Sequence, residues 1–429
     1  MKLNREHCLP VAILGHLKWT LLNVLIPVWQ AKFRYPRVVK RLRNSVCKNK
    51  IKVLFVTGTT AKWKCQSLYD LMAASENYEP YVCQTICDVE SSLCHADRVR
   101  HLDECKSYYV DRGMNYVEAY SREREEWTDL NEFRADIVFY SQPWEVAPVQ
   151  LPHHVAQTAL TFMVPYFVAN YGDFEMDIRG PFQRTLFAYC TLNQAWADIF
   201  KANVSGLLFA GGFWSVGHPA LDPYYVNHGK CDSKGCIIYA PHWSIDCPGN
   251  ENTENYSTFL QTGRIILAFA QAHSELKWVF RPHPTLRIVL TRTGVWSDDE
   301  IADYYKAWAD VGVLSQGGGY EELFMASSAL ITDCGSFLTE YACTGNPIVH
   351  LVSSTAKIKP MKPSADLYAT YYQVRDSAEL NAVLDEVVVR RQDPKREERL
   401  AKVRESGLLD NYAAQNILNE LDQLLGFRK

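Results

Sequence analysis

The sequence predicts an α/β chain with two Rossmann-like, doubly wound domains that face a cleft. Three observations support this prediction. The chain has 429 residues, which is more than one ordinary hydrophobic core holds and enough for two domains of about 200 residues each. Two successive series of short apolar runs alternate with helix-like segments. A stretch rich in glycine and proline, residues 211–223, separates the two series.

The first series opens with a β-branched run, Ile51 to Thr57, that ends in a glycine turn at Gly58. A helix-like segment, Gln66 to Ala74, follows at once. A strand, a tight glycine turn and a helix together open a parallel α/β unit. Further apolar, strand-like runs follow at Tyr81 to Ile86, Asp136 to Tyr140 and Leu160 to Val168.

The second series repeats this pattern. Cys236 to Ala240 predicts a strand, and Phe259 to Ala272 has the apolar period of a helix. Further strands are predicted at Trp278 to Arg281, Ala329 to Thr332 and Pro347 to Val352, and further helices at Ser336 to Cys343, Leu380 to Val389 and Arg396 to Leu425. We therefore divide the chain into an N-terminal segment (1–48), a first domain (49–215) and a second domain (216–429) that includes the terminal helices.

The N-terminal segment joins an apolar stretch to a basic one. Val11 to Val28 is apolar, but Lys18 and Pro27 interrupt it, so it is not a clean membrane-spanning helix. Eight basic residues follow with no acid between them: Lys32, Arg34, Arg37, Lys40, Arg41, Arg43, Lys48 and Lys50. This composition favours contact with an anionic membrane surface. The alternative is a packed helix with a solvated basic face.

Composition excludes several classes of protein. A formal net charge of -4 gives no global reason to expect nucleic-acid binding. The 13 cysteines contain no Cys-x-x-Cys pair, so they predict neither a zinc ribbon nor a thioredoxin-like site. Their irregular spacing in a large chain is typical of reduced thiols in the cytoplasm. No paired acidic motif of the Asp-x-Asp type stands at an expected site, so we expect no obligatory metal and no cofactor.

One segment has the pattern of a phosphate cradle. The predicted strand that ends at Thr332 runs into Asp333, and a helix begins near Gly335 and Ser336. A helix N-terminus offers backbone N–H groups and a positive dipole end to a phosphate. Glu340 lies one turn after Ser336, where a carboxylate can accept hydrogen bonds from ribose hydroxyls. The alternative is an ordinary N-cap by Asp333 or Ser336 with nothing bound.

Two more segments follow predicted strands and contain histidine. His283 stands between two prolines, directly after Arg281 and Pro282. A histidine held at a strand end can act as an acid or base, and an arginine can pair with phosphate. His242 follows the strand that ends at Ala240 and falls at the same expected edge. Either histidine can instead be an ordinary loop residue bonded to the backbone.

Taken in order, these segments resemble the CDP-glycerol:poly(glycerophosphate) glycerophosphotransferase family of teichoic acid synthesis. The family motifs "YAPTW", "HP", "ITDYSS" and "GKPI" correspond here to Tyr239 to Trp243, His283-Pro284, Ile331 to Ser336 and Gly345 to Ile348. Upstream, Gly217-His218-Pro219 and Asp222 resemble the family's "GYPRND". The resemblance covers residues 215–355.

The resemblance implies a GT-B fold with a donor-nucleotide domain after an acceptor domain. It implies a cytoplasmic enzyme, peripheral on the inner face of the cell membrane. Its donor is CDP-glycerol or a related nucleotide, and its acceptor is a polymer or a lipid-linked molecule. The acceptor hydroxyl attacks the β-phosphorus of CDP-glycerol and CMP leaves. By position, His283 matches a catalytic histidine, Ser336 a ligand of the donor phosphate and Glu340 a ligand of the ribose.

Several positions depart from the family pattern. Cys334-Gly335 replaces the family's Tyr-Ser, and His242 replaces a threonine. The family's N-terminal "WHG" histidine has no direct match, and His153 and His154 are the nearest substitutes, of which we take His154 as a catalytic candidate. Arg281, His242, Asp333 and Gly335 complete the predicted donor site. One alternative is a GT-B glycosyltransferase that uses a nucleotide sugar for capsule or lipopolysaccharide synthesis. Another is a noncatalytic protein that binds polymer or lipid-linked glycans.

Overall fold

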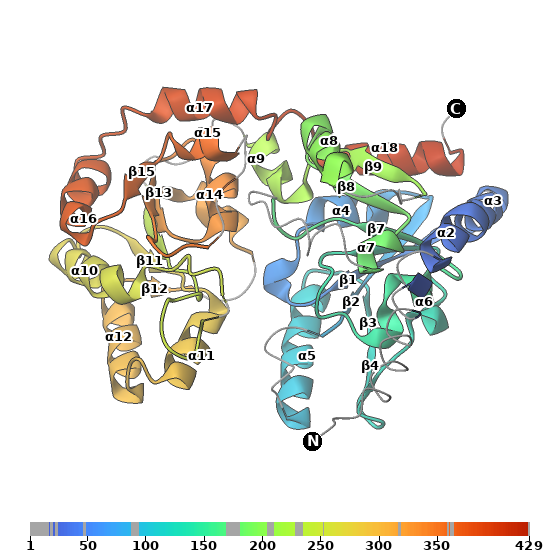
Figure 1. Ribbon diagram of the computed structural model, residues 1–429, viewed down its shortest axis with the longest axis horizontal. Helices are drawn as coiled ribbons and strands as arrows, with labels where there is room; N and C mark the ends of the chain where they lie inside the picture. The colour runs from blue at the N-terminus through green and yellow to red at the C-terminus, as the bar shows by residue number, and fades with distance from the viewer. Residues whose placement is uncertain are drawn as a thin grey trace, which may run out of the picture. The chain divides into compact units, whose positions relative to one another are not determined.

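The computed structural model of the protein describes residues 17, 20–21, 25–45, 49–86, 94–168, 181–203, 210–227, 235–251, 253–315, 319–357, 360 and 364–427. Most of the apolar stretch from Val11 to Val28, and Lys48, lie outside the described residues. The chain divides into two compact units (Figure 1). Unit 1 comprises residues 1–166, 173–219 and 413–429, and unit 2 comprises residues 167–172 and 220–412.

Seven parallel strands form the sheet of unit 1, in the order β3-β2-β1-β6-β7-β8-β9. Their bounds are β1 Ile51–Thr57, β2 Tyr78–Gln84, β3 Tyr116–Val117, β6 Ile137–Tyr140, β7 Leu160–Met163, β8 Ala188–Thr191 and β9 Gly212–Ser215. A separate antiparallel ribbon pairs β4 (Tyr120–Ser121) with β5 (Glu126–Trp127). Every residue of β6, β7 and β8 is buried, as expected for parallel strands covered on both faces.

The helices of unit 1 alternate with these strands. They are α4 Gln66–Ala74, α5 His95–Val110, α6 Pro152–Val155, α7 Pro181–Arg184 and α8 Gln194–Asn203. Both β1 and α4 have the bounds that the sequence predicts. The glycine turn between them also lies where the sequence places it.

The last helix of the chain, α18 (Ala413–Leu425), belongs to unit 1. It packs against α4, and its Asp422 carboxylate accepts a 2.8 Å hydrogen bond from the Tyr78 hydroxyl. The sequence instead predicts that these residues belong to the second domain. An apolar face on a terminal helix indicates burial, but it does not show which domain supplies the partner. The predicted helix from Arg396 to Leu425 is also two helices, α17 (Arg396–Glu405) and α18, which are separated near Gly407.

Six parallel strands form the sheet of unit 2, in the order β12-β11-β10-β13-β14-β15. Their bounds are β10 Cys236–Ala240, β11 Trp278–Phe280, β12 Val313–Leu314, β13 Ser327–Thr332, β14 Ile348–Leu351 and β15 Tyr372–Val374. The helices are α9 Asp222–Val226, α10 Phe259–Ala272, α11 Pro284–Thr293, α12 Asp298–Val311, α13 Glu321–Met325, α14 Gly335–Ala342, α15 Ser364–Tyr368, α16 Ser377–Leu384 and α17. A π-helical turn, Asp385–Val389, extends α16.

The core of unit 2 explains the uninterrupted apolar strands. Ile237 and Tyr239 of β10 join one hydrophobic cluster with residues of α10, α11, α12 and α16. Ile238 alternates to the other face, and α14, α15 and α17 contact one another. Helices therefore cover both faces of the sheet (Figure 1). These features confirm the predicted α/β class with two Rossmann-like domains.

Each sheet has a single position where the strand order reverses. In unit 1 it lies between β1 and β6, and in unit 2 between β10 and β13. In open parallel sheets, ligands bind outside the carboxyl ends of the strands that flank such a switch point. The segments after Thr57 and Tyr140 in unit 1, and after Ala240 and Thr332 in unit 2, are therefore the places to look for sites.

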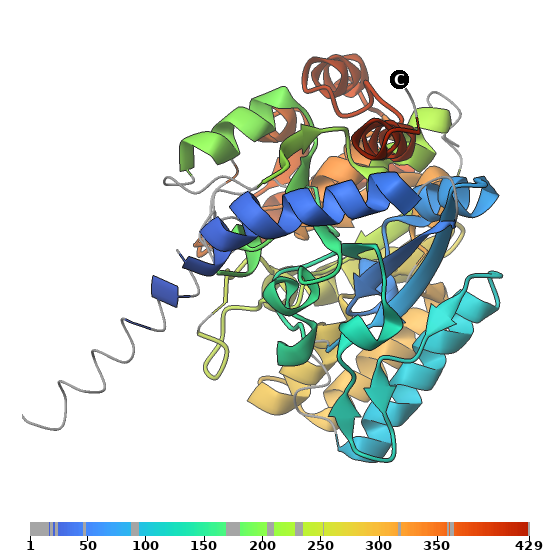
Figure 2. The same ribbon diagram turned by 90° about the vertical axis from the view of Figure 1, so that its right-hand side faces the viewer.

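The basic N-terminal segment is helical and packs on unit 1. Helix α2 (Ile26–Trp29), a π-helical turn (Gln30–Arg34) and α3 (Tyr35–Ser45) follow one another without a break (Figure 2). Tyr35, Val38 and Leu42 are buried, and the Tyr35 hydroxyl lies 2.7 Å from Thr161 Oγ1 of β7. This helix is therefore part of the core of unit 1. Within the described residues, no helix combines the length and the apolar character that crossing a bilayer requires.

Candidate functional site

Three loops meet at the carboxyl edge of the sheet of unit 2. They follow β10, β11 and β13, which are neighbours in the sheet. The backbone joins the first two loops, since Arg281 N–H donates to Tyr239 O at 2.8 Å and His283 N–H donates to Pro241 O at 3.0 Å. The Thr332 hydroxyl donates to Ala240 O at 2.6 Å and joins the third. The sequence-predicted residues of all three loops therefore share one edge, at the switch point.

The Asp333 carboxylate joins two segments of this edge, the loop after β10 and the start of α10. Its carboxylate accepts hydrogen bonds from the backbone N–H of His242 at 2.6 Å and from that of Thr258 at 2.7 Å. The residue is only 3% exposed. Burial raises the pKa of Asp333 to about 6, and these hydrogen bonds oppose the rise. Each carboxylate oxygen thus accepts a backbone hydrogen bond, so Asp333 positions the two loops, and its predicted contact with the nucleotide donor stays a prediction.

His242 is held inside a cluster of rings. Its Nδ1 lies 2.8 Å from Ser244 Oγ, and the rings of Trp243, Tyr256 and His283 lie within 5.7 Å of its own, measured between centroids. The residue keeps part of its surface exposed, but loss of hydration lowers the pKa of His242 to about 3. The imidazole is therefore neutral near pH 7, and it offers a phosphate no positive charge.

This neutral histidine predicts a loss of stability in acid. Because the folded-state pKa of His242 lies below its unfolded value, the unfolded chain binds more protons as the pH falls below about 6.5. Between about pH 7 and pH 5, His242 lowers the free energy of unfolding by up to about 2 kcal/mol. The raised pKa of Asp333 has the opposite effect on the free energy of unfolding. Burial lowers the pKa of His350 to about 4, so His350 adds to the loss of stability in acid.

We expect His242→Gln to lose less stability than the wild type between these two pH values. Urea unfolding at both pH values, for this variant and for His273→Gln as a control in the same unit, measures the difference. An unchanged pH dependence in His242→Gln would show that this imidazole already titrates normally in the folded protein.

His283 caps the helix that follows it. Its Nδ1 accepts a 3.2 Å hydrogen bond from the Thr285 N–H, at the start of α11. The ring proton of the neutral imidazole is therefore assigned, from this bond, to Nε2. Pro282 and Pro284 restrict the backbone on either side, and the residue is partly exposed. The helix cap thus occupies Nδ1 of His283, and an imidazole in this tautomer suits hydrogen bonding to a phosphate oxygen better than proton abstraction.

Arg281 and Glu340 lie in a buried polar cluster built around Tyr320. The Arg281 guanidinium donates to Ser315 Oγ at 2.7 Å, and its central carbon lies 5.3 Å from the centroid of the Tyr320 ring. The Tyr320 hydroxyl lies 3.0 and 2.8 Å from the two carboxylate oxygens of Glu340. Glu340 has no exposed surface. Its carboxylate is bonded by Tyr320 and presents no surface to a ribose in this structure, so its role as a ribose ligand stays a prediction.

The N-terminus of α14 lies as the sequence predicts. Gly335 is the first helical residue, and the preceding residue, Cys334, makes no side-chain cap bond. Ser336 is partly exposed in the first turn, and its hydroxyl lies 3.5 Å from Cys334 Sγ. Burial raises the pKa of Cys334 to about 11, so this thiol is an unreactive neighbour. Gly335 and Ser336 are thus the members of the predicted site that best fit a phosphate.

His154 lies away from the ligand edge of its sheet. It belongs to α6, and its carbonyl accepts a 3.2 Å hydrogen bond from Asn131, which precedes β6. Leu160 begins β7 only a few residues later, and its N–H donates to Asp136, directly before β6. His154 therefore lies at the amino ends of the strands and is exposed. This placement corrects its predicted catalytic role, because a loop after β6 must return to the amino edge before the next parallel strand begins.

Three residues of this site, Thr258, Ser315 and Tyr320, are not predicted as site residues from the sequence. Thr258 had a weak signal as the residue before the helix that begins at Phe259. Ser315 lies at the site because β12, which it follows, pairs with β11, and Tyr320 lies there because its ring packs against Phe337 of α14. No local pattern marks either residue. Among the residues that the structure describes, no three His, Cys, Asp or Glu side chains gather as metal ligands do.

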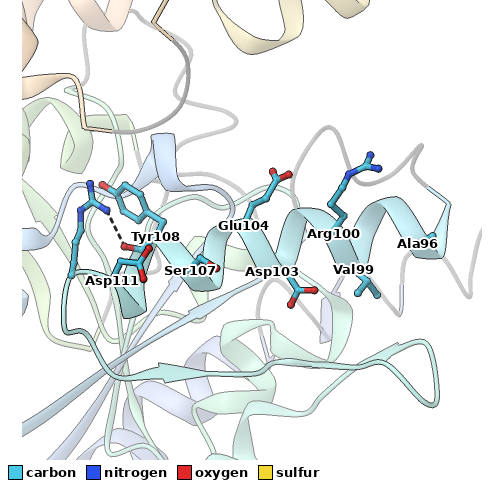
Figure 3. A pocket seen from close by; sticks show the side chains of 9 residues that line it. Ala96, Val99, Arg100, Asp103, Glu104, Ser107, Tyr108 and Asp111 are labelled. Carbon is cyan, nitrogen blue, oxygen red and sulfur yellow. Dashed lines mark hydrogen bonds between the residues drawn. The ribbon is translucent and has the colours of Figure 1, made fainter.

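A separate hollow of about 750 Å³ lies along α5 in unit 1. Figure 3 shows that its lining side chains come from this one helix and the turn that ends it. Arg100, Asp103, Glu104 and Asp111 line it, so charges of both signs are interspersed. A ligand site needs groups that converge from several elements. This hollow therefore does not compete with the edge between β10 and β13.

Comparison with known proteins gives the fold a name. Neither a protein-family model nor a curated protein sequence matches this chain. Among solved structures, a variant of the wall teichoic acid polymerase TagF soaked with CDPG has 13% identity, covers 99% of both chains and has a TM-score of 0.50. The chain has a TagF-like GT-B fold.

Epimerases share this fold. The UDP-GlcNAc 2-epimerase from Neisseria meningitidis, bound to UDP-GlcNAc, has 14% identity and a TM-score of 0.52, over 87% of this chain and 100% of the epimerase. The MnaA–UDP structure from S. aureus has 12% identity and a TM-score of 0.52, over 88% of this chain and 98% of MnaA. At these identities the likeness extends to the fold alone.

Proposed function

We propose that this chain is a transferase that moves glycerol phosphate from CDP-glycerol to a polymer or lipid-linked acceptor and releases CMP. One observation carries the proposal. The three segments that resemble the glycerophosphotransferase motifs meet at the switch point between β10 and β13, where they bring together a helix N-terminus and His283. The soaked TagF structure, with its CDPG, supports a cytidine nucleotide as donor.

In the proposed reaction, the acceptor hydroxyl oxygen attacks the β-phosphorus of CDP-glycerol. The new P–O bond forms as the bond from the β-phosphorus to the oxygen that bridges it to the α-phosphate breaks, so that CMP leaves with that electron pair, and the proton of the acceptor hydroxyl is released to water. Phosphoryl transfer depends on positioning and charge stabilisation more than on covalent catalysis. Ser336 and the first turn of α14 bind the phosphates, and His283 donates to an oxygen that gains charge in the transition state. Arg281 lies in the same polar cluster as Glu340, the predicted ribose ligand, which has no exposed surface in this structure.

The experiment supplies the full chain with CDP-glycerol or with UDP-GlcNAc, together with membranes that contain candidate acceptors, and measures CMP and UDP release. CMP release with a product lengthened by glycerol phosphate supports the proposal. UDP release supports the second candidate, a nucleotide-sugar enzyme, which the fold shared with UDP-GlcNAc 2-epimerases favours. Release of neither nucleotide would contradict both and would favour a noncatalytic role.

We also propose that the N-terminal helix holds the protein on an anionic membrane surface. Trp29 and Phe33 are exposed on it, and Leu17, Leu21 and Leu25, which precede it at the same four-residue spacing, are exposed as well. Residues four apart lie on one face of a helix. Lys32, Arg37 and Lys40 are exposed on the same helix. An exposed apolar stripe beside lysine and arginine is typical of a helix that lies in the membrane interface.

Replacing both Trp29 and Phe33 with serine is expected to weaken binding to vesicles that contain anionic lipid. The two rings leave the interface, while Tyr35 and Leu42 keep the helix packed. Added salt is expected to weaken wild-type binding, because each basic residue near the surface contributes about 1 kcal/mol. Vesicle sedimentation measures both effects. The matched control replaces two exposed apolar residues of unit 2, Ile288 and Val313, with serine. Equal binding by both double variants would contradict the proposal.

A further inference from the structure

A second hollow in unit 1, of about 550 Å³, lies beside the N-terminal helix. That helix lines most of it, and Phe187, Ala210 and Leu424 line the rest. Leu424 belongs to α18, which lies beside α3 (Figure 2). The volume is in the range of small-molecule sites, about 300–1,000 Å³. Unlike the hollow along α5, this one has lining groups that converge from several segments of the chain.

The hollow lies at the opposite edge of the sheet from the switch point. Phe187 directly precedes β8, and Ala210 stands shortly before β9. Both residues are therefore at the amino ends of their parallel strands, whereas the ligands of a doubly wound sheet bind at the carboxyl ends. A ligand in this hollow is therefore neither the donor nor the acceptor of the proposed transfer.

The most buried side chains of the lining, Tyr35 and Phe187, form an apolar base. They are 1% and 5% exposed, and their ring centroids lie 5.2 Å apart. The Tyr35 hydroxyl is bonded to Thr161, so the base offers ring surface rather than a polar group. Pro36 and Val39 also line the hollow, and both keep exposed surface. Such a lining suits a hydrocarbon chain, because removing apolar surface from water is favourable.

Two cationic side chains also line the hollow. Lys40 and Arg43 are exposed, and the lining contains no acidic residue. Arg43 Nε donates to Leu424 O at 2.8 Å, which fixes the guanidinium at the hollow and leaves its two terminal nitrogens for other acceptors. Among the described residues, neither Lys40 nor Arg43 forms an ion pair. Because a guanidinium fork matches the oxygens of a phosphate, the hollow is complementary to a hydrocarbon chain with an anionic head.

We propose that this hollow binds one acyl chain of an anionic membrane phospholipid, whose phosphate contacts Lys40 and Arg43. The proposal is carried by an apolar base beside two cations that have no acidic partner. An apolar segment of a second copy, or of another protein, would leave both cations unpaired. A membrane phospholipid is favoured as the source of the chain because the same helix exposes Trp29 and Phe33, which are proposed to enter the membrane interface.

This inference deepens the proposed membrane contact and rests on it in one respect, which is that a bilayer supplies the lipid. Trp29 and Phe33 would insert among many lipids without selecting one. A hollow of fixed shape would instead take one lipid at a time and would distinguish headgroups by their charge. Attachment would then require an anionic phospholipid and not only a negatively charged surface.

Isothermal titration calorimetry on the full chain tests the inference with short-chain lipids. The probes are dioctanoyl phosphatidic acid, dioctanoyl phosphatidylcholine and octanoate, each below the concentration at which it forms micelles. We expect phosphatidic acid to bind about tenfold more tightly than the other two, because phosphatidylcholine carries a compensating ammonium and octanoate a single negative charge. Equal or tighter binding of octanoate would identify the ligand as a free fatty acid and would overturn the assignment to a phospholipid.

Lys40→Glu is expected to weaken binding of phosphatidic acid about tenfold, because it places a carboxylate beside the phosphate. Arg37→Glu is the matched control, since it makes the same change of charge at an exposed residue of the same helix that does not line the hollow. Val39→Trp is expected to abolish measurable binding, because the indole fills the hollow. If Val39→Trp does not fold, Lys40→Glu carries the test at an exposed position.

Vesicle sedimentation of the wild type separates failure of this inference from failure of the proposed membrane contact. Vesicle binding without binding of monomeric phosphatidic acid would overturn the inference alone. Binding of monomeric phosphatidic acid without vesicle binding would contradict the membrane contact and would leave the hollow as a lipid site. An equal loss in Lys40→Glu and Arg37→Glu would show unspecific attraction between charges and would overturn the inference. Wild-type affinity in a folded Val39→Trp protein would also overturn it.

Discussion

Replacing His283 with alanine is expected to lower the single-turnover rate of transfer by about 10²–10³-fold. The reason is the fixed orientation of the imidazole. The Thr285 N–H donates to Nδ1, so Nε2 carries the proton and can stabilise charge that develops on a phosphate oxygen. Such donors act mainly in the transition state, so donor affinity is expected to change little. Rapid-quench measurement with excess enzyme isolates this step.

A second variant separates catalysis from helix capping. His283→Ala also removes the cap of α11, which costs about 1 kcal/mol. His283→Asn restores the cap, because asparagine is among the best N-cap residues, but its shorter side chain does not reach the position of Nε2. We expect His283→Asn to melt like the wild type and to remain as slow as His283→Ala. A normal rate in the folded His283→Asn protein would exclude catalysis by Nε2.

Ser336→Ala is expected to affect a different step from His283→Ala. Its hydroxyl is proposed to contact phosphate in the ground state and in the transition state alike, so its loss is expected to weaken donor binding more than it slows the chemical step.

The sequence predicted the central strands, and the helices α4, α10 and α14 between them, because their signals are local. β1, β10, α4 and α10 have the predicted bounds, since each is a continuous apolar run or a regular helical period beside a turn. β3 and β12 have two residues each and were missed. Strands this short depend on the neighbouring strand for their hydrogen bonds. Their own residues provide no period to detect.

The site was predicted in outline, but its interactions were not. Motif order brought His242, His283 and Ser336 to one sheet edge, because parallel strands of a doubly wound sheet share that edge. Whether a side chain faces a ligand or the protein interior depends on contacts between distant segments. Glu340 is bonded by Tyr320, and His154 lies at the opposite edge of its own sheet. Sequence spacing predicted neither arrangement.

Asp333 also makes contacts between distant segments that the sequence spacing does not predict. A polar residue directly after a strand, before a helix, resembles an N-cap or a ligand. In the folded chain its carboxylate instead joins the loop after β10 to the start of α10, through the N–H groups of His242 and Thr258. Asp333→Ala is expected to lower the free energy of unfolding by about 3 kcal/mol, because two buried backbone donors lose their acceptor.

Hydrogen exchange gives a local measurement of this effect. In Asp333→Ala, the amides of His242 and Thr258 are expected to exchange faster, and CMP affinity is expected to fall because the loop no longer holds His242 beside His283. Asp333→Asn keeps one acceptor oxygen but turns an amide N–H₂ toward the other donor, so it is expected to lose about half as much stability. Asp376, which caps α16 in the same unit through the Ala378 N–H and is exposed, provides the matched control. Its alanine variant is expected to lose about 1 kcal/mol and to leave exchange at His242 and Thr258 unchanged. Wild-type exchange at both amides in Asp333→Ala would mean that other contacts hold the two loops together, and that the Asp333 carboxylate is available to a ligand after all.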